Sequence, residues 1–448
     1  MIIGSKFAKQ WLRRRGLLAS LGFLLLMLCV PARAEPALSL KGPRPVVWAD
    51  FLGVNAQLLW FDEVHYRQQL DLLQALGLSW VRVDLHWDRL EPAPGQWQLT
   101  ELDRLTAVLA EKKLKSLLYL VGSAPFASSA PSGSSNADQY PPLSAELFAE
   151  SLGFLAQRYP TVNAWQVWNE PNISPYWQPM EDPLAYQQLL ETSLTRLASA
   201  NPAAQQVLGG MAYYSQMPLR GGLMLEALAN LGSVRSDRVV AYHPYSFTPE
   251  GDSASDRDFL STSAWLNQQL RARGSGPIWA TEFGWSTYSG PVEWQPQVDE
   301  LGQADYLIKR IALMSAMDFD RVFLFTLSDL DARASVRDQH YGLLRLDGSK
   351  KPAYLALQRF LKTTGPSLQP QPAPEFATAP AGMISIAWQR TDGRWVWLFW
   401  AQEPGQVRLQ RQGSGTLYNP LKGTSKRFSV GTSGALIEVG REMQIVVM

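Results

Sequence analysis

The run Val322-Phe323-Leu324-Phe325 decides how the rest of the sequence is interpreted. Four apolar residues follow one another here, with Arg321 before them and Thr326 after them. A strand with one face in water alternates apolar and polar residues, so an unbroken apolar run indicates a strand buried on both faces. Strands of this kind belong to parallel sheets that are covered by helices. The sequence therefore predicts an α/β protein.

Comparable runs recur along the chain between longer helical windows. The eight predicted strands are Asp50–Ala56, Ser79–Leu85, Ser116–Val121, Ala164–Trp168, Gln206–Gly210, Arg238–Tyr242, Pro277–Thr281 and Arg321–Thr326. The helical windows include Glu63–Leu76, Glu101–Lys113, Ala145–Arg158, Leu184–Ala200 and Asp299–Met317. This count and size predict a (β/α)8 TIM barrel over 35–362. A doubly wound open sheet is the alternative, but it normally carries a glycine-rich first turn, and Val54-Asn55-Ala56 has none.

The C-terminal part of the chain has a different pattern. The segment 363–382 is rich in proline and predicts a linker. Only strand-like runs follow it, namely Met383–Gln389, Trp395–Trp400, Val407–Gln410, Arg427–Val430, Ala435–Val439 and Met443–Val447. They predict a small antiparallel β-sandwich-like module over 383–448. We expect Trp388, Trp395, Trp397 and Trp400 to pack this module onto the barrel rather than form a separate carbohydrate-binding surface.

The first 34 residues have the pattern of an export signal. Basic residues extend to Arg15, an apolar stretch covers Leu17–Val30, and Pro31-Ala32-Arg33-Ala34 ends in an A-x-A cleavage pattern. An apolar stretch of about 15 residues is shorter than the roughly 20 that a membrane span needs. The sequence therefore predicts a signal peptide over 1–34 and a periplasmic protein. An uncleaved segment associated with the inner membrane is the alternative.

Composition and charge exclude several classes of function. The 448 residues include 41 basic and 40 acidic side chains, and removing 1–34 leaves 35 basic and 40 acidic ones. A mildly acidic chain lacks the basic surface that nucleic-acid binding requires. The one cysteine, Cys29, lies inside the signal, so no disulfide is expected. No two histidines have the spacing of metal ligands, and no GxGxxG or P-loop occurs, so we expect no metal and no cofactor.

Two glutamates come at the ends of predicted strands. The fourth strand ends in Trp168-Asn169-Glu170-Pro171-Asn172, and the seventh ends in Thr281-Glu282-Phe283-Gly284-Trp285. Active sites of such barrels lie at the carboxyl ends of the strands. Two carboxyl groups across a cleft are what glycoside hydrolysis requires, one as proton donor and one as nucleophile or base. We therefore expect a catalytic pair, with surface salt bridges as the alternative.

Electrostatics divides the work between the two carboxyl groups. At the roughly 5–5.5 Å of a retaining pair, both groups cannot ionise easily, so one pKa rises and that group can act as the acid. The other group must stay ionised, which requires hydrogen-bond donors. Arg82, at the end of the second strand, is expected to hold Glu282 as a carboxylate. An ordinary ion pair between Arg82 and Asp84 is the alternative.

These motifs resemble clan A of the retaining glycoside hydrolases, and family 39 most of all. The resemblance covers about 50–362, with Val81-Arg82-Val83-Asp84 among its supporting stretches. It implies that Glu170 is the acid/base and Glu282 the nucleophile. It also implies that Asn169 bonds the sugar 2-hydroxyl and that Tyr245 donates its hydroxyl to Glu282.

Further side chains are expected to line the cleft. His243 would do so through its ring N–H, or else be a core histidine with its hydrogen bonds satisfied. Trp177 and Trp285 are expected to stack on the apolar faces of sugar rings, with core packing as the alternative. Weaker candidates for stacking are Tyr140, Tyr176, Tyr213 and Trp294. The clan often has a tryptophan after the eighth strand, where this chain has Phe325-Thr326-Leu327-Ser328-Asp329, so the sugar itself is not predicted.

The sequence as a whole predicts a retaining, endo-acting glycoside hydrolase. Its exported character and its β module are similar to periplasmic endoglycosidases of exopolysaccharide operons, which implies a role in making or degrading biofilm polysaccharide. We expect a monomer whose partner is a polysaccharide or oligosaccharide substrate. Two alternatives remain: a carbohydrate-binding or scaffold component of a polysaccharide assembly machine, and a transglycosylase that uses the same covalent intermediate.

Overall fold

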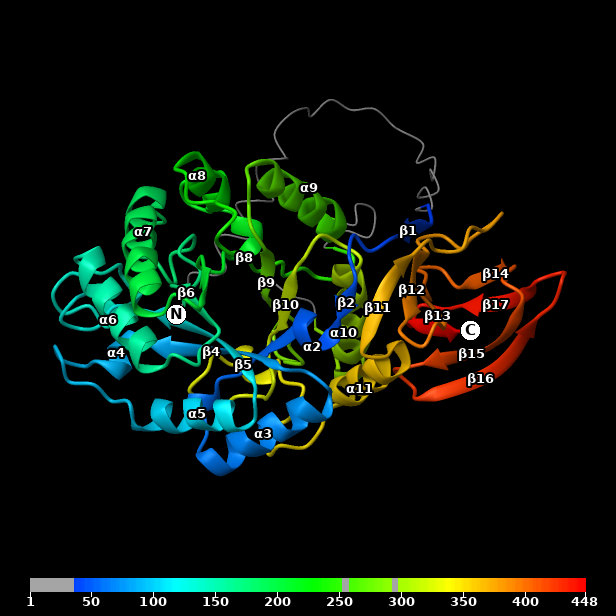
Figure 1. Cartoon of the computed structure of the whole chain (residues 1–448), viewed down its shortest axis with the longest axis horizontal. Helices are drawn as coiled ribbons and strands as arrows, with labels where there is room; N and C mark the ends of the chain where they lie inside the picture. The colour runs from blue at the N-terminus through cyan, green and yellow to red at the C-terminus, as the bar shows by residue number, and fades with distance from the viewer. Residues whose placement is uncertain (1–35, 252–257, 292–296) are drawn as a thin grey trace, which may run out of the picture.

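A parallel barrel forms the larger part of the molecule (Figure 1). The computed structural model describes residues 36–251, 258–291 and 297–448. The predicted signal over 1–34 lies outside these residues. The barrel strands are β3 (Leu52–Asn55), β4 (Trp80–His86), β5 (Lys115–Val121), β6 (Ala164–Val167), β7 (Gln205–Val207), β8 (Val240–Tyr242), β9 (Ile278–Phe283) and β10 (Arg321–Leu324). All eight correspond to predicted strands, so the barrel prediction is confirmed.

The order of the strands closes the sheet on itself. Neighbouring strands are hydrogen-bonded in the order β7-β6-β5-β4-β3-β10-β9-β8, all in parallel. A parallel bridge between Val207 and Val239 then joins the two ends of the row. This is the topology of a (β/α)8 barrel rather than an open sheet.

Helices cover the outside of the barrel. The longer ones are α3 (Glu63–Ala75), α5 (Thr100–Glu111), α6 (Ala145–Arg158), α7 (Pro183–Ala200), α8 (Met224–Asn230), α9 (Asp258–Ala272), α10 (Glu300–Ser315) and α11 (Pro352–Thr364). Short helices are α2 (Trp48–Phe51) and α4 (Trp87–Leu90). Side-chain caps begin several of them, as when Asp182 accepts from the backbone N–H groups of Leu184 and Ala185. In the part of the chain that is described, no helix is both long and apolar enough to cross a membrane.

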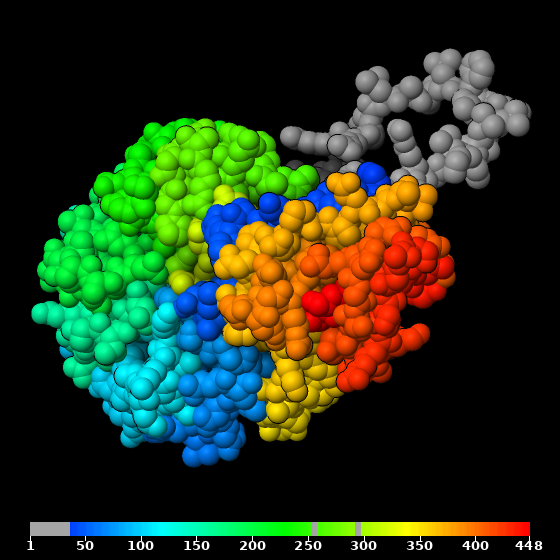
Figure 2. Space-filling view, turned by 45° about the vertical axis from the view of Figure 1, so that its right-hand side comes forward, coloured from blue at the N-terminus to red at the C-terminus, as the bar shows by residue number. Residues whose placement is uncertain are grey.

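The C-terminal module lies beside the barrel (Figure 2). It is built around one large sheet. Its strands follow the order β16-β15-β18-β13-β12-β11-β2, with β1 paired to β12. Their bounds are β1 (Leu38–Leu40), β2 (Val46–Val47), β11 (Ser367–Gln371), β12 (Ile384–Arg390), β13 (Trp395–Trp400), β15 (Gly413–Asn419), β16 (Thr424–Val430) and β18 (Gln444–Val447). A two-stranded sheet of β14 (Gly405–Leu409) and β17 (Ala435–Val439) packs against one face. The expected antiparallel module is confirmed.

The four tryptophans of the module divide between the two faces of its sheet. Trp395 and Trp397 stack at 6.2 Å and pack under β14 and β17. Trp388 and Trp400 lie in the cluster that is continuous with the barrel core. All four are buried. The prediction that they pack the module onto the barrel is confirmed for Trp388 and Trp400 and is wrong for Trp395 and Trp397, which pack inside the module. The module is therefore fixed to the barrel through an apolar face rather than held on a tether.

The proline-rich segment 363–382 is not simply a linker. Its residues Ser367–Gln371 form β11, which pairs with β12 on one side and with the short β2 on the other. Proline lacks the N–H that a central strand must donate. Pro370 fits because β2 pairs only with Ser367 and Leu368, so the proline comes where β11 has a single neighbour. The N-terminal strands thus belong to the same sheet as the module.

Candidate active site

Glu170 follows the end of β6 in an unusual backbone turn. Trp168 and Glu170 both have left-handed backbone, with φ of 70° and 48°, a conformation that non-glycine residues seldom adopt. The Glu170 N–H donates to the Gly210 carbonyl at 2.9 Å, which ties the turn to the next strand. The carboxyl group meets His243, whose Nδ1 lies 2.7 Å from Oε1. Strained backbone of this kind gathers at functional sites.

A register shift in β9 brings Glu282 into the barrel. Ala280 pairs with Val322, but Phe283 pairs with Leu324, so three steps along β9 match two along β10. In a regular strand, Thr281 and Glu282 would point to opposite faces. Here both reach the interior: Thr281 Oγ1 lies 3.1 Å from His243 Nε2, and Glu282 contacts a buried arginine. The shift re-aims a side chain, as bulges beside active sites do.

Two donors hold the carboxyl group of Glu282, one on each oxygen. Arg82 Nη1 donates to Oε1 at 2.7 Å, and the Tyr245 hydroxyl donates to Oε2 at 3.1 Å. Burial, followed by the charge of Glu282, raises the pKa of Tyr245 well above its usual value. The phenol therefore keeps its proton and remains a donor. Both contacts expected for Glu282 are present, and together they fix the orientation of its carboxyl group.

Arg82 is the centre of the polar layer. It is 1% exposed and donates to Asn55 Oδ1 and Asn169 Oδ1, each at 2.7 Å, and to Gln166 Oε1 at 3.1 Å. Its guanidinium lies 3.9 Å from the centre of the Tyr119 ring. Every acceptor around this buried cation is thus provided by an inward-facing side chain at a strand end. We did not predict three of these partners of Arg82 from the sequence, namely Asn55, Gln166 and Tyr119. The signal that could have found them is a polar side chain within an otherwise apolar strand.

The two carboxyl groups are close enough to share one reacting bond. One oxygen of Glu170, one oxygen of Glu282 and one nitrogen of His243 all lie within 4.8 Å of one another. Burial, together with the negative charge of Glu282, raises the pKa of Glu170, while the hydrogen bond from His243 opposes this rise. Glu170 is therefore the member of the pair that keeps its proton more readily. Glu282 is the member held by two hydrogen-bond donors. His243 lies between them, 3.7 Å from Glu282 through Nε2.

The same three residues have the spacing of a metal site. A carboxylate, an imidazole and a second carboxylate could together coordinate a divalent cation. The fixed positive charge of Arg82 opposes this, because it lies 2.7 Å from Glu282 Oε1 in a buried position. His243 Nδ1 and Glu170 Oε1 are also already in contact at 2.7 Å. The donor set fits proton transfer better than metal binding.

Trp177 and Trp285 do not offer the stacking surfaces expected of them. Each is 1% exposed. Trp177 packs edge-to-face on Trp168 at 5.4 Å, and so supports the turn that carries Glu170. Trp285 Nε1 donates to the carbonyls of Ser246 and Phe247, each at 3.0 Å, which fixes the loop after Tyr245. The prediction of sugar stacking is wrong for both, because their rings face the core behind the site.

Other aromatic side chains remain accessible near the carboxyl pair. Tyr176 and Tyr213 are 39% and 37% exposed. Burial, with the charge of Glu170 next, raises the pKa of Tyr213 to about 12, so this hydroxyl lies within electrostatic reach of the pair. Tyr140 is half-buried, and Trp294 lies outside the described residues. Tyr176 and Tyr213 are thus better placed than the two tryptophans for sugar stacking.

Phe325 occupies the place where the clan often has a tryptophan. It is half-buried, and its ring lies edge-on to Tyr341 at 5.3 Å. Tyr341 in turn lies 6.4 Å from the ring of Tyr245, which bonds Glu282. The three rings form an aromatic wall on the side of Glu282.

Comparison with solved structures finds proteins of similar fold. A family 39 glycoside hydrolase from the gut symbiont Bacteroides cellulosilyticus WH2 matches with a TM-score of 0.68 and 19% identity, over 89% of this chain and 80% of its own. A monomeric β-xylosidase from Caulobacter crescentus CB15 matches with a TM-score of 0.62 and 16% identity, over 92% and 99%.

A family 30 endoxylanase from Clostridium papyrosolvens C71 is also similar, with a TM-score of 0.60 and 12% identity over 92% of this chain and 99% of its own. No family profile matches the sequence. No curated protein matches it either. At these identities the likeness establishes a shared fold, which covers both the barrel and the β module.

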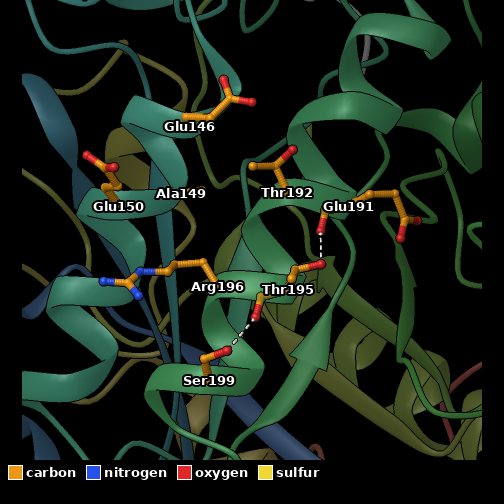
Figure 3. A pocket seen from close by; sticks show the side chains of 8 residues that line it. All are labelled: Glu146, Ala149, Glu150, Glu191, Thr192, Thr195, Arg196 and Ser199. Atoms are coloured by element: carbon orange, nitrogen blue, oxygen red, sulfur yellow. Dashed lines mark hydrogen bonds between the residues drawn. The ribbon is translucent and has the colours of Figure 1, made fainter.

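A separate groove lies on the outside of the barrel, away from the carboxyl pair. Its volume is about 670 Å³. It runs between α6 and α7, and Figure 3 shows the side chains that line it. Glu146, Glu150 and Glu191 line it together with Arg196. These residues belong to the two outer helices, whereas the catalytic candidates come from the carboxyl ends of the barrel strands. The groove therefore plays no part in the site.

Proposed function

We propose that this protein is a retaining glycoside hydrolase. The observation that carries the proposal is the approach of Glu170 and Glu282, whose oxygens come within 4.8 Å at the ends of β6 and β9. Retaining pairs stand about 5–5.5 Å apart, whereas inverting pairs need about 6.5–9.5 Å to admit a water molecule. The separation in this chain favours direct attack on the sugar.

Glu282 would act first as the nucleophile. Arg82 and Tyr245 orient it, each by a hydrogen bond to one oxygen. It attacks the anomeric carbon and forms a glycosyl ester, while Glu170 gives its proton to the departing oxygen. The raised pKa of Glu170 supports this role, since the acid must hold its proton until the bond breaks.

In the second step, the proton would be transferred in the opposite direction, to Glu170. Glu170, now a carboxylate, accepts a proton from an incoming water molecule, whose oxygen attacks the anomeric carbon and releases Glu282. His243 Nδ1 lies 2.7 Å from Glu170 and can donate a hydrogen bond to this carboxylate. Two displacements return the sugar with its original configuration.

The stereochemical outcome tests the mechanism. We expect NMR spectra of the earliest product to show retained configuration at the anomeric carbon. A slow 2-deoxy-2-fluoroglycoside should leave a covalent label, and peptide mass spectrometry should locate it on Glu282. Early product of inverted configuration, or a label on another residue, would overturn the proposal.

We further propose that the substrate is an exported bacterial polysaccharide and that cleavage occurs inside its chain. The signal-like pattern over 1–34 and the resemblance to exported endoglycosidases support this. Purified protein should be incubated with bacterial exopolysaccharides and the length of the products followed over time. An endo-acting enzyme gives a rapid fall in chain length and a ladder of oligosaccharides. Release of monosaccharide alone from the first minutes would contradict endo action.

The proposed location is the periplasm. N-terminal sequencing of protein made in its own host should find a start near Glu35 if the signal is cleaved. An intact Met1 in the membrane fraction would mean that the apolar stretch Leu17–Val30 serves as an inner-membrane anchor. Activity recovered only from the cytoplasm would contradict both hypotheses, the cleaved signal and the inner-membrane anchor.

A further inference from the structure

The carboxylate of Asp84 is a buried charged group that the proposed chemistry does not use. Asp84 is 8% exposed and lies on β4. Its Oδ1 atom is buried and has no hydrogen-bond partner among the residues that are described. Its Oδ2 atom lies 3.3 Å from Nε2 of His86. Because an unpaired buried acceptor costs free energy, a ligand that completes it is a natural explanation.

The position of Asp84 points to the substrate. Side chains two residues apart on a strand share a face, so Asp84 faces the barrel interior with Arg82. Two residues of strand rise place it roughly 6.6 Å beyond Arg82, toward the open carboxyl end of the barrel. It pairs across the ladder with Tyr119, the ring beneath the Arg82 guanidinium. Asp84 therefore stands above the donor that holds Glu282.

The wall around Asp84 is negatively charged. Asp88 Oδ1, 3.9 Å from His86 Nδ1, is a second buried oxygen without a hydrogen-bond partner in the described part of the chain. Asp138 lies close enough to act electrostatically on Asp88 and adds a third acidic side chain to this wall. Among the described residues, the ion pairs of Asp84 and Asp88 both involve His86. An incoming carboxylate would meet like charges at this wall.

We propose that Asp84 contacts the substrate and accepts hydroxyl hydrogens from a neutral sugar on the glycone side, and that the same wall excludes uronic acids. This inference rests on the proposed hydrolase function. An ionised carboxylate only accepts hydrogen bonds, and hydroxyl groups are the donors that a neutral sugar offers. Oδ2 keeps acceptor capacity beyond its contact with His86, because each oxygen of an ionised carboxylate has two lone pairs, so a sugar hydroxyl can bond there.

Glycone-side placement follows from the partners of Arg82. The sugar that becomes bonded to Glu282 is the glycone, and Arg82 donates directly to Glu282. A ring seated on Glu282 then extends past Arg82 toward Asp84. A uronic acid in this place would bring its carboxylate against Asp84 at a site with little water, where like charges repel strongly.

Binding to an inactivated parent tests the inference. The Glu170→Gln protein should be titrated by calorimetry with xylohexaose, cellohexaose, mannohexaose and a hexamannuronate. We expect at least one neutral hexasaccharide to bind and the hexamannuronate to bind at least tenfold more weakly. Adding Asp84→Asn should weaken binding of the neutral hexasaccharide at least tenfold. It should also reduce the difference in affinity between the neutral hexasaccharide and the hexamannuronate. Adding Asp71→Asn, an exposed aspartate on α3, is the matched control and should change neither affinity.

Kinetics separates substrate contact from support of Arg82. On a neutral glycan that the wild-type enzyme cleaves, Asp84→Asn should raise KM at least tenfold and change kcat by less than fivefold. A fall in kcat with KM unchanged would mean that Asp84 acts by positioning Arg82, and would overturn the inference. Unchanged neutral affinity in Asp84→Asn, or a preference of the parent for hexamannuronate, would overturn it as well.

Failure of the inference can be told from failure of the proposed function. If the wild-type protein cleaves the hexamannuronate with retention, the hydrolase proposal stands and the neutral-sugar inference falls. If it neither binds nor cleaves any of the four hexasaccharides or the exopolysaccharides, the hydrolase proposal itself falls. If a neutral glycan is cleaved and the Asp84→Asn effect is present, both stand.

Discussion

Two layers of the barrel interior, only two residues apart along the same strands, have opposite characters. The lower layer is apolar and consists of Trp80, Leu117, Ala164, Val207, Val239, Ala241, Trp279 and Phe323. The layer above it, on β4, β5, β6 and β9, carries Arg82, Tyr119, Gln166 and Thr281, which are buried as deeply. The same scaffold thus closes one end of the barrel with aromatic packing and equips the other with fixed polar groups.

The difference shows what each layer contributes. In the lower layer, Trp80 lies 5.9 Å from Trp279 and 6.3 Å from Phe323, both edge-to-face, so stability comes from packing. In the upper layer, burial of Arg82 is tolerated only because four acceptors surround it. We therefore expect changes in the upper layer to alter chemistry first and changes in the lower layer to alter stability first.

The largest effect is expected at Glu282. Glu282→Gln keeps the shape of the side chain, but an amide cannot attack the anomeric carbon. We expect kcat to fall roughly 10⁵-fold, as when other covalent nucleophiles are removed. Glu111→Gln, on the exposed face of α5, is the matched control and should retain full activity. Turnover within tenfold of wild type in Glu282→Gln would remove Glu282 from the mechanism.

Glu170 is expected to show a loss that depends on the leaving group. General acids contribute roughly 10²–10⁴-fold, so Glu170→Gln should lose about that much on natural glycans. In a dinitrophenyl glycoside, the dinitrophenolate leaving group departs without needing a proton. Formation of the glycosyl ester from this substrate should therefore be nearly as fast as in wild type. Stopped-flow measurement of the dinitrophenolate burst checks this. A fall in the burst rate as large as the fall in turnover of natural glycans would contradict the acid role.

The sequence predicted the strands of both regions better than it predicted the site. Two strands, Trp395–Trp400 and Ala435–Val439, have the predicted bounds. Their ends were predictable because turn residues on both sides of an apolar run limit where a strand can begin and end. The strand Gly413–Asn419 was missed, since its mixture of glycine and polar residues lacks apolar alternation. β1 and β2 join a sheet whose other strands come more than 300 residues later, and local patterns carry no sign of that pairing.

In the site, residue type was predictable but orientation was not. Strand ends pointed to Glu170, Glu282 and Arg82, since carboxyl ends of parallel strands meet. The burial of Trp177 and Trp285 was not predictable, because a tryptophan in a loop can turn either face toward the core. Which way it turns depends on contacts made by distant segments, such as the carbonyl of Ser246 that accepts from Trp285.

In the lower layer, we expect a loss of stability with chemistry preserved. Trp279→Ala removes a ring that packs on Trp80 and Phe323, and should lower the free energy of unfolding by about 3–5 kcal/mol. Chemical denaturation measures this change. At a temperature where the variant stays folded, its kcat/KM should lie within a few-fold of wild type. A large fall in kcat/KM without a fall in stability would mean that the two layers are not separable in this way.

The subtlest expected effect is a shift in the pH profile when His243 is replaced. Burial is the largest cause of the raised pKa of Glu170, and the hydrogen bond and charge of His243 oppose it. His243→Ala removes both the hydrogen-bond donor and the charge, so the pKa of Glu170 should rise further. Because the acid must be protonated in the free enzyme, the alkaline limb of kcat/KM against pH should move to higher pH. Thr281→Val leaves the imidazole in place, loses only the contact at Nε2, and should move the limb less. If the alkaline limb stays in place or moves to lower pH in His243→Ala, His243 does not lower the pKa of Glu170.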